Sequence, residues 1–423
     1  MSGKRRWLEW GKDAVIVLLA ISAAYLLTKT PLVQDSGFLP QGETAQTVEK
    51  NDTVTLTSAA YPSRLSVRVE QGRYAVQYDQ AQVDSLFAGM GPLLGEALVS
   101  AGQPEQITEG QWQRYLQGLS IYFDFSGEIP LSALGSWIQG ERTCELEDSA
   151  RRIVLAAGVG DEVLLSYQAQ DGNFYVCETR LSKSLHLSPA VEGIEENGAL
   201  FAFESDQMEA FLDPYTLLTE ETGGTVYTAV TPISASSDLT QLLENLSFNG
   251  QNHTSISGGE AFLEGENRLE IQNNGTVIYR AGQQGKYEVA YSGSEPTLAE
   301  MIETVRKLAE DTVGSLCGEA RLHLISAQET AEGWQIQFGY QLNGSSVWLY
   351  QDGWAAQFLV RDGTVSEFTL HFRSYTATEE QALMLPVYRA AVMLPDLTEE
   401  QLELVVQYRD QGDAEISPIW VAQ

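Results

Sequence analysis

The chain has 423 residues, more than one hydrophobic core usually supports, so two or three domains are expected. Its 25 Lys and Arg against 58 Asp and Glu give a formal net charge of −33, which repels phosphate backbones and excludes sequence-independent nucleic-acid binding. The hydrophobic fraction of 43% and the charged fraction of 20% are ordinary for a chain that folds.

The N-terminus predicts a single membrane anchor. Lys4, Arg5 and Arg6 precede an apolar run over residues 14–27. The positive-inside rule places the basic end in the cytoplasm and the bulk of the chain on the extracytoplasmic side of the cell membrane. With flanking charged residues that reach the interface, the anchor covers residues 13–30 and the cytoplasmic head residues 1–12. A cleaved signal peptide and a buried helix of a soluble domain are the alternatives.

Four residues of the anchor are candidates for contact with a partner helix. Asp13 lies at the helix edge, where it either reaches the interface or pairs with a cation of another helix. Ala20, Ala23 and Ala24 would allow two helices to approach closely, although small residues are also ordinary lipid-compatible filler.

Beyond the anchor, residues 31–52 contain scattered Pro and Gly without periodicity and predict a tether. The remaining sequence divides into an N-terminal α+β domain over 53–150, a mainly β middle domain over 151–294 and a C-terminal α+β domain over 295–423.

In the first domain, alternating apolar residues over 65–69 and 74–78 predict a hairpin around Gly72. A helical pattern follows over 83–98, and we expect the residues from Gly89 to Pro92 to interrupt it. A second helix is predicted around Trp112 and a strand over 121–125.

The last third has the clearest pattern. Thr297 opens a helix whose apolar stripe runs over residues 298–313, and several strands follow between residues 320 and 372. Thr378 and Gln381 have the spacing of a capping box and predict the start of a helix that continues past Pro386. The predicted fold class is α+β: a transmembrane helix, then a multi-domain ectodomain of antiparallel sheets with helices packed on one face.

No residue pattern for catalysis or cofactor binding is found. HExxH, GxSxG, SxxK and a Gly-rich phosphate loop are absent from the sequence. His323 and His371 lie in strand patterns and are expected to be structural. Cys144, Cys177 and Cys317 lack metal-ligand spacing, and a disulfide between the first two is one alternative to buried thiols. We therefore predict no catalytic, cofactor-binding or metal-binding residue.

Three aromatic residues are candidates for a binding surface. Trp334, Trp348 and Trp354 crowd the predicted final sheet. They either pack in the core or form part of an interface, where tryptophan is favoured.

Four local patterns accompany this layout. They are Trp112 with the segment Leu119–Phe125 leading to Pro130; Leu242–Leu246 followed by Glu264–Leu269 and Asn274–Tyr279; Gly333–Phe338 followed by Leu342–Gly344; and the closing Pro418–Trp420. Together with the short head, single helix and ectodomain, they resemble the YycH/YycI family, the membrane-anchored regulators of the WalK–WalR two-component system of low-GC Gram-positive bacteria. The resemblance spans most of residues 60–423.

The resemblance implies a non-enzymatic protein whose anchor and ectodomain bind and modulate a WalK-like sensor histidine kinase that controls cell-wall homeostasis. It also implies a YycI-like partner protein. The first alternative is a general interaction module of the cell envelope, and the second is a wall-active enzyme.

Overall fold

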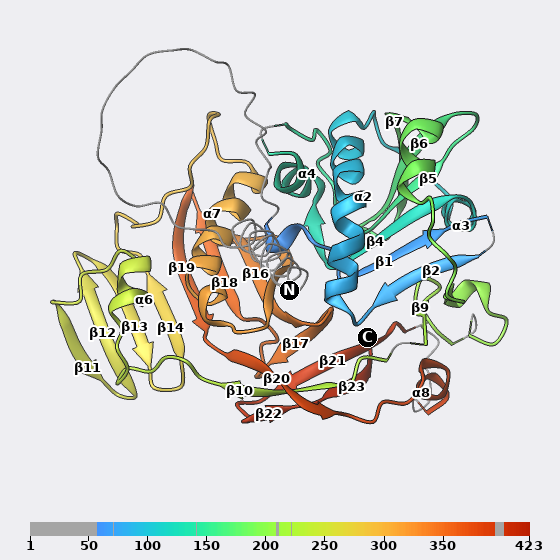
Figure 1. The fold of residues 1–423 in the computed structure, drawn as a ribbon. Helices are drawn as coiled ribbons and strands as arrows, with labels where there is room; N and C mark the ends of the chain where they lie inside the picture. Colours follow the sequence, from blue (N-terminus) through green and yellow to red (C-terminus); the bar gives the residue numbers. More distant parts are fainter. Residues whose placement is uncertain (1–56, 71, 141, 209–210, 221, 394–401) are drawn as a thin grey trace, which may run out of the picture. The chain divides into compact units, whose positions relative to one another are not determined.

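The computed structural model describes residues 57–423 apart from residues 71, 141, 209–210, 221 and 394–401 (Figure 1). The predicted head, anchor and tether lie outside the described residues. Among the helices that the structure describes, none is long and apolar enough to cross a bilayer.

The first sheet has seven strands in the order β2-β1-β4-β5-β6-β7-β3, and its neighbouring strands are antiparallel. The predicted hairpin is confirmed: Leu65 of β1 pairs with Val76 of β2. The strands are β1 Arg64–Arg68, β2 Arg73–Gln77, β3 Glu105–Ile107, β4 Ser120–Pro130, β5 Ser149–Ala157, β6 Glu162–Ala169 and β7 Phe174–Ser182.

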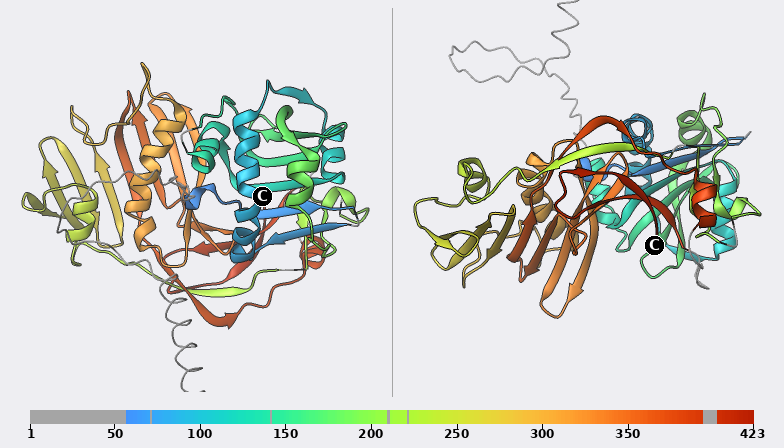
Figure 2. Two further views of the ribbon diagram at one scale, coloured as in Figure 1. Left: turned by 45° about the horizontal axis from the view of Figure 1, so that its top comes forward. Right: turned by 90° about the horizontal axis from the view of Figure 1, so that it is seen from below.

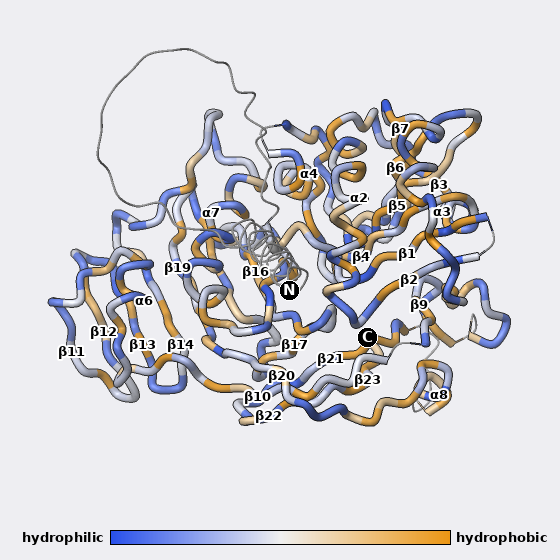
Figure 3. The backbone as a smooth tube through the Cα atoms, viewed as in Figure 1, coloured by the Kyte–Doolittle hydropathy of each residue, from blue (hydrophilic) through white to orange (hydrophobic). Residues whose placement is uncertain are grey.

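Helices cover both faces of this sheet, because its central strands are apolar on both sides. On β4, Ile121 and Phe123 point toward helices α2 (Gln80–Ser100) and α4 (Leu131–Gln139). The intervening Tyr122 packs in a separate cluster with Trp112 of α3 (Glu109–Gln117). The expected arrangement with helices on one face only was therefore wrong for this sheet. Figure 3 shows the hydrophobic residues along β4, β5 and β6.

The second sheet has eleven strands in the order β11-β12-β13-β14-β19-β18-β16-β17-β21-β23, and β15 pairs with the other edge of β16. Among the described strand pairs of this sheet, β17 and β21 are parallel and all the others are antiparallel. Figure 2 shows β11–β14 (yellow) at the edge that lies away from β21 and β23 (red). The strands are β11 His253–Ile256, β12 Gly259–Glu264, β13 Asn267–Gln272, β14 Thr276–Arg280, β15 Arg321–Thr330, β16 Gly333–Leu342, β17 Ser345–Leu349, β18 Ala356–Arg361, β19 Thr364–His371, β21 Leu404–Asp410 and β23 Pro418–Ala422.

Smaller elements complete the fold. The predicted helix α7 (Leu298–Asp311) is confirmed, and Thr297 and Glu300 form its capping box. A three-stranded sheet has the order β20-β10-β22, and β8 pairs with β9. These elements are α5 Ser188–Ala190, α6 Thr240–Asn245, α8 Val387–Met393, β8 Leu200–Phe201, β9 Leu217–Leu218, β10 Thr225–Val230, β20 Ser374–Gln381 and β22 Glu415–Ile416.

Two local predictions were wrong. Helix α2 continues through Pro92, since Phe87 and Leu94 on either side of it are buried against the first sheet and hold the helix together. The capping-box pattern at Thr378 lies in strand β20, where its hydroxyl donates to the carbonyl of Val226 on β10. Pairing with β10 overrides this local helix signal, and α8 begins only after Pro386.

Residues 54–423 form one unit in their contacts. Strand β5 runs across the predicted domain boundary between residues 150 and 151. The division of residues 53–423 into three domains stays a prediction.

The two large sheets meet where β4 passes β15. The ladder between β4 and β5 shifts register between Asp124 and Ile129, and Ser126 in that bulge has a φ of 62°. Next to it, a Cβ built on Gly127 would lie 2.0 Å from the carbonyl oxygen of Leu324 on β15. Only glycine permits this approach of the two backbones.

Replacing Gly127 with alanine should therefore destabilise the protein by about 1–3 kcal/mol, because the added methyl group must push the two sheets apart. Urea unfolding followed by circular dichroism measures the change. Gly110→Ala is the matched control: a Cβ there meets nothing within 4 Å and lies in a helix, so its stability should be unchanged or slightly higher. Equal stability of the two variants would contradict the close approach.

Candidate functional site

A buried cluster of charged residues lies beside this joint. Strands β1 and β5 contribute three guanidinium groups, β4 and two later segments contribute three carboxylates, and we call the set the arginine–carboxylate cluster. Its members are Arg64, Arg151, Arg152, Asp124, Asp213 and Glu403. These charges interrupt otherwise apolar strands, which is tolerable in a buried position only when each charge is paired.

Glu403, which immediately precedes β21, is the centre of the cluster. Its Oε1 accepts from Nη1 of Arg64 at 2.7 Å, and its Oε2 accepts from Nη1 of Arg151 at 2.6 Å. Arg152 donates to the same carboxylate at 3.2 Å. One carboxylate from the C-terminal segment is thus held by three arginines of the first sheet.

Ion pairing with the arginines outweighs burial in setting the pKa values of the carboxyl groups in this cluster. Burial alone would raise the pKa of Glu403, but the guanidinium groups of Arg151, Arg152 and Arg64 lower that pKa well below its ordinary value. Burial likewise acts to raise the pKa of Asp124, and Arg151 and Arg64 lower it overall. Both groups are therefore ionised at neutral pH.

A pocket of about 280 Å³ opens next to the cluster. Its walls come from β1, β4 and β5 of the first sheet, from β15, β16 and β17, from the turn between β17 and β18, from β21 and from the C-terminal Gln423. We call it the tryptophan pocket because Trp348 and Trp354 both line it. Arg64 and Arg151 of the cluster form part of its wall.

The turn between β17 and β18 sets the positions of both indole rings. Gly353 has a φ of 80°, and a Cβ built there would lie 3.1 Å from three carbons of the Trp348 ring. Backbone thus supports one face of that ring while Trp348 stays 45% exposed. Trp354 packs on the imidazole of His371 with the ring centroids 4.8 Å apart, and Tyr350 lies 5.5 Å away on the same imidazole.

One titratable group in the pocket wall and one near the cluster have shifted pKa values. Burial lowers the pKa of His323, which lines the pocket, to about 4, against a smaller raising effect of the Gly339 backbone. Its Nδ1 has no hydrogen-bond partner among the described residues. Burial raises the pKa of Glu128 on β4 to about 7, although Arg151 and Arg152 act to lower it.

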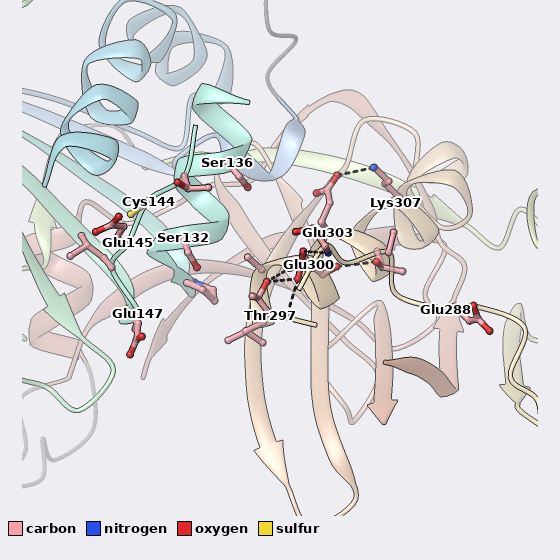
Figure 4. Close-up of a pocket in the computed structure, with 18 residues that line it drawn as sticks. Ser132, Ser136, Cys144, Glu145, Glu147, Glu288, Thr297, Glu300, Glu303 and Lys307 are labelled. Carbon is pink, nitrogen blue, oxygen red and sulfur yellow. Dashed lines mark hydrogen bonds and ion pairs between the residues drawn. The ribbon is translucent and has the colours of Figure 1, made fainter. Parts of the chain in front are cut away.

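A second, larger depression lies between α4 and the N-terminal part of α7 (Figure 4). Its volume is about 890 Å³, and five glutamates line it: Glu145, Glu147, Glu288, Glu300 and Glu303. Glu300 caps α7, and Glu303 accepts from the indole nitrogen of Trp137 at 3.0 Å. The hydrogen bonds of Glu300 and Glu303 thus stabilise helix α7 and its contact with α4.

A third feature is an apolar surface around α8. Val387, Ala390 and Ala391 of this helix are buried. Several neighbours on and before the helix are exposed instead: Leu383, Leu385, Tyr388, Val392 and Met393. Grouped exposed apolar side chains are typical of a surface that contacts another protein.

The structure brings together some of the predicted residues. Trp348 and Trp354 share one pocket, whereas Trp334 lies half-buried on β16, opposite Val360, and does not line it. Asp13, Ala20, Ala23 and Ala24 lie outside the described residues. The three cysteines carry free, buried thiols, and burial raises the pKa of Cys177 to about 12. Among the described residues, no group of three His, Cys, Asp or Glu could hold a metal ion.

Sequence reasoning missed the arginine–carboxylate cluster. The signal was present locally, since Arg64, Asp124 and the Arg151–Arg152 pair break apolar strand patterns. The partner Glu403 lies 339 residues from Arg64, and nothing in its own segment marks it as buried.

Comparison with solved structures shows a YycH-like fold. The chain aligns with the crystal structure of YycH from Bacillus subtilis with a TM-score of 0.52 and 12% identity, over 87% of this chain and 95% of that one. It also aligns with an uncharacterized protein from Eubacterium rectale with a TM-score of 0.30 and 13% identity, over 47% of this chain and 76% of that one. By sequence, neither a protein-family model nor a curated protein matches the chain.

Replacing Glu403 with glutamine should lower the free energy of unfolding by about 3–5 kcal/mol, because the buried Arg64 and Arg152 and the partly buried Arg151 lose their shared counter-charge. Chemical denaturation at pH 7 measures the loss. Glu96→Gln is the control: Glu96 pairs with Arg142 on the surface, and exposed pairs contribute little, so no measurable change is expected. A Glu403→Gln variant as stable as the control would contradict the central role of this carboxylate.

The raised pKa of Glu128 predicts that its contribution to the free energy of unfolding falls as the pH rises. The lowered pKa of Glu403 has the opposite effect. A carboxyl group whose pKa is raised on folding stabilises the folded state below the unfolded pKa of 4.5, and this contribution is lost as the pH rises through about 7. Glu128→Gln should therefore be more stable than the wild type at pH 8, by at most about 3 kcal/mol, and the advantage should shrink toward pH 5. Unfolding curves at both pH values test this, and a constant difference would exclude it.

Proposed function

We propose that this chain is a non-catalytic, membrane-anchored extracytoplasmic regulator that binds a sensor histidine kinase and changes the kinase's signalling state. The observation that carries the proposal is the YycH-like fold over 87% of the chain. It agrees with the resemblance of the sequence to the YycH/YycI family, whose members regulate the WalK–WalR system. On this proposal the kinase is WalK-like and controls cell-wall homeostasis.

The proposed topology follows from the N-terminus. Basic residues at positions 4–6 stay in the cytoplasm, residues 13–30 cross the membrane once, and the ectodomain lies outside. Within the bilayer, Ala20, Ala23 and Ala24 lie on one face of the proposed helix and permit close packing against a helix of the kinase. Asp13 supplies a charge for pairing at the membrane edge.

Such a contact regulates the kinase only if it differs between the kinase's states. A helix that binds one state more tightly by about 1.4 kcal/mol shifts the balance between the states about tenfold. A few close-packed alanines and one ion pair are sufficient for a difference of this size.

The exposed apolar side chains around α8 favour a second protein contact outside the membrane. Tyr388 and Val392 are one helical turn apart, and both are exposed on the solvent side of α8. A YycI-like protein, which the family resemblance implies, is the partner that we propose for this surface.

A photo-crosslinking residue at Ala20 or Ala24 of the full-length protein should trap a sensor histidine kinase in intact cells, because these positions face the proposed partner helix. Mass spectrometry of the crosslinked product identifies the partner. The same residue at Leu18, on the opposite face of the helix, and at the exposed Val159 of the ectodomain serves as the control.

Capture from Ala20 and Ala24 but not from the two control positions supports the proposal. Exchange of residues 14–30 for an unrelated membrane span should then weaken control of the kinase while the protein stays in the membrane. Equal capture from both helix faces, or none from either, contradicts a specific helix contact.

A further inference from the structure

The tryptophan pocket has the features of a ligand site, and these features do not depend on the kinase proposal. A ring that only fills a core is covered on both faces. Trp348 instead is backed by Gly353 on one face and remains 45% exposed. Trp354 is fixed in place by its contact with His371. Ordered aromatic surface at the wall of a concave site is typical of small-molecule recognition.

Hydrogen-bonding groups surround the two rings. The carboxylate of Asp352 lies on the turn between them and is 54% exposed. Neither indole nitrogen has a hydrogen-bond partner among the described residues. Arg151 uses four N–H groups toward Asp124 and Glu403, so one of its five donors is left. Donors and acceptors are thus both present.

The charge balance of the pocket disfavours an ionic ligand. The two arginines in its wall are matched by the carboxylates of Asp124 and Glu403. Asp352 adds a negative charge, and the chain as a whole carries −33, so the site offers no net attraction to an anion. For a cation, the buried carboxylates are likewise taken up by the arginines, and the remaining carboxylate of Asp352 is 54% exposed, so its attraction is screened by water. A neutral polar ligand needs no counter-charge in the pocket.

Size and polarity together select the class of ligand. A volume of about 280 Å³ corresponds to roughly nine water molecules at about 30 Å³ each, which is room for one six-membered sugar ring. A pyranose has a flat C–H face that packs on an indole and hydroxyl groups at its rim that donate and accept hydrogen bonds. We propose that the tryptophan pocket binds one pyranose unit of a neutral saccharide, stacked on Trp348 and hydrogen-bonded to Asp352.

Saturation-transfer NMR on the full-length chain, in a detergent without a sugar headgroup, tests the proposal. The probes are cellotetraose and the β-1,4-linked tetramer of N-acetylglucosamine, and glucuronate is the anionic comparison. We expect saturable binding of at least one neutral probe with a dissociation constant of about 1 mM. Trp348→Ala should weaken this binding about tenfold.

Tyr291→Ala is the matched control, because Tyr291 is 48% exposed and does not line the pocket. It should bind as the wild type does. If Trp348→Ala unfolds, Asp352→Asn decides instead: it preserves the side-chain volume and should weaken binding about threefold or more through the lost acceptor charge. No saturable signal at about 50 mM, binding of glucuronate alone, or binding unchanged in both pocket variants would overturn the inference.

Discussion

The structure depends on the burial of one carboxylate among three arginines. Removing such charges from water costs several kcal/mol per ion, and only close mutual pairing offsets that cost. Glu403 provides the pairing for Arg64 and Arg151 of the first sheet. Within the cluster, the first sheet supplies three arginines and one carboxylate, Asp124, so its charges are balanced only when Asp213 and Glu403 from later segments are also in place. Residues 54–423 accordingly form one unit, and the last strands complete the core that the first strands begin.

The tryptophan pocket lies at the same junction, with walls from the first sheet, from the β17–β18 turn and from β21. A ligand that contacted all three parts would add its binding energy to the stability of their association. On the two proposals, the helix contact forms in the membrane and the ligand binds outside it. The two proposals thus concern separate physical inputs, a helix contact and a ligand, and each can fail without the other.

Local sequence signals were reliable where local interactions dominate. The hairpin of β1 and β2 and the helix α7 that Thr297 opens formed as predicted, because both depend on residues a few positions apart. The helix signal at Thr378 failed because β10, about 150 residues earlier, offers a row of backbone hydrogen-bonding groups to β20. Pro92 failed to interrupt α2 because burial of the flanking turns outweighs the cost of one lost hydrogen bond.

By itself, the sequence determined the α+β class with antiparallel sheets, since this follows from periodicity and local pattern. The YycH-like character entered as a resemblance to a known family, and the structural comparison agrees with it. It also marked Trp348 and Trp354 as candidates. Only the tertiary structure decided that these two share a pocket that excludes Trp334, and that Glu403 meets Arg64. Strand order brings together residues as far apart as these two, 339 positions, and no local property of either segment records that order.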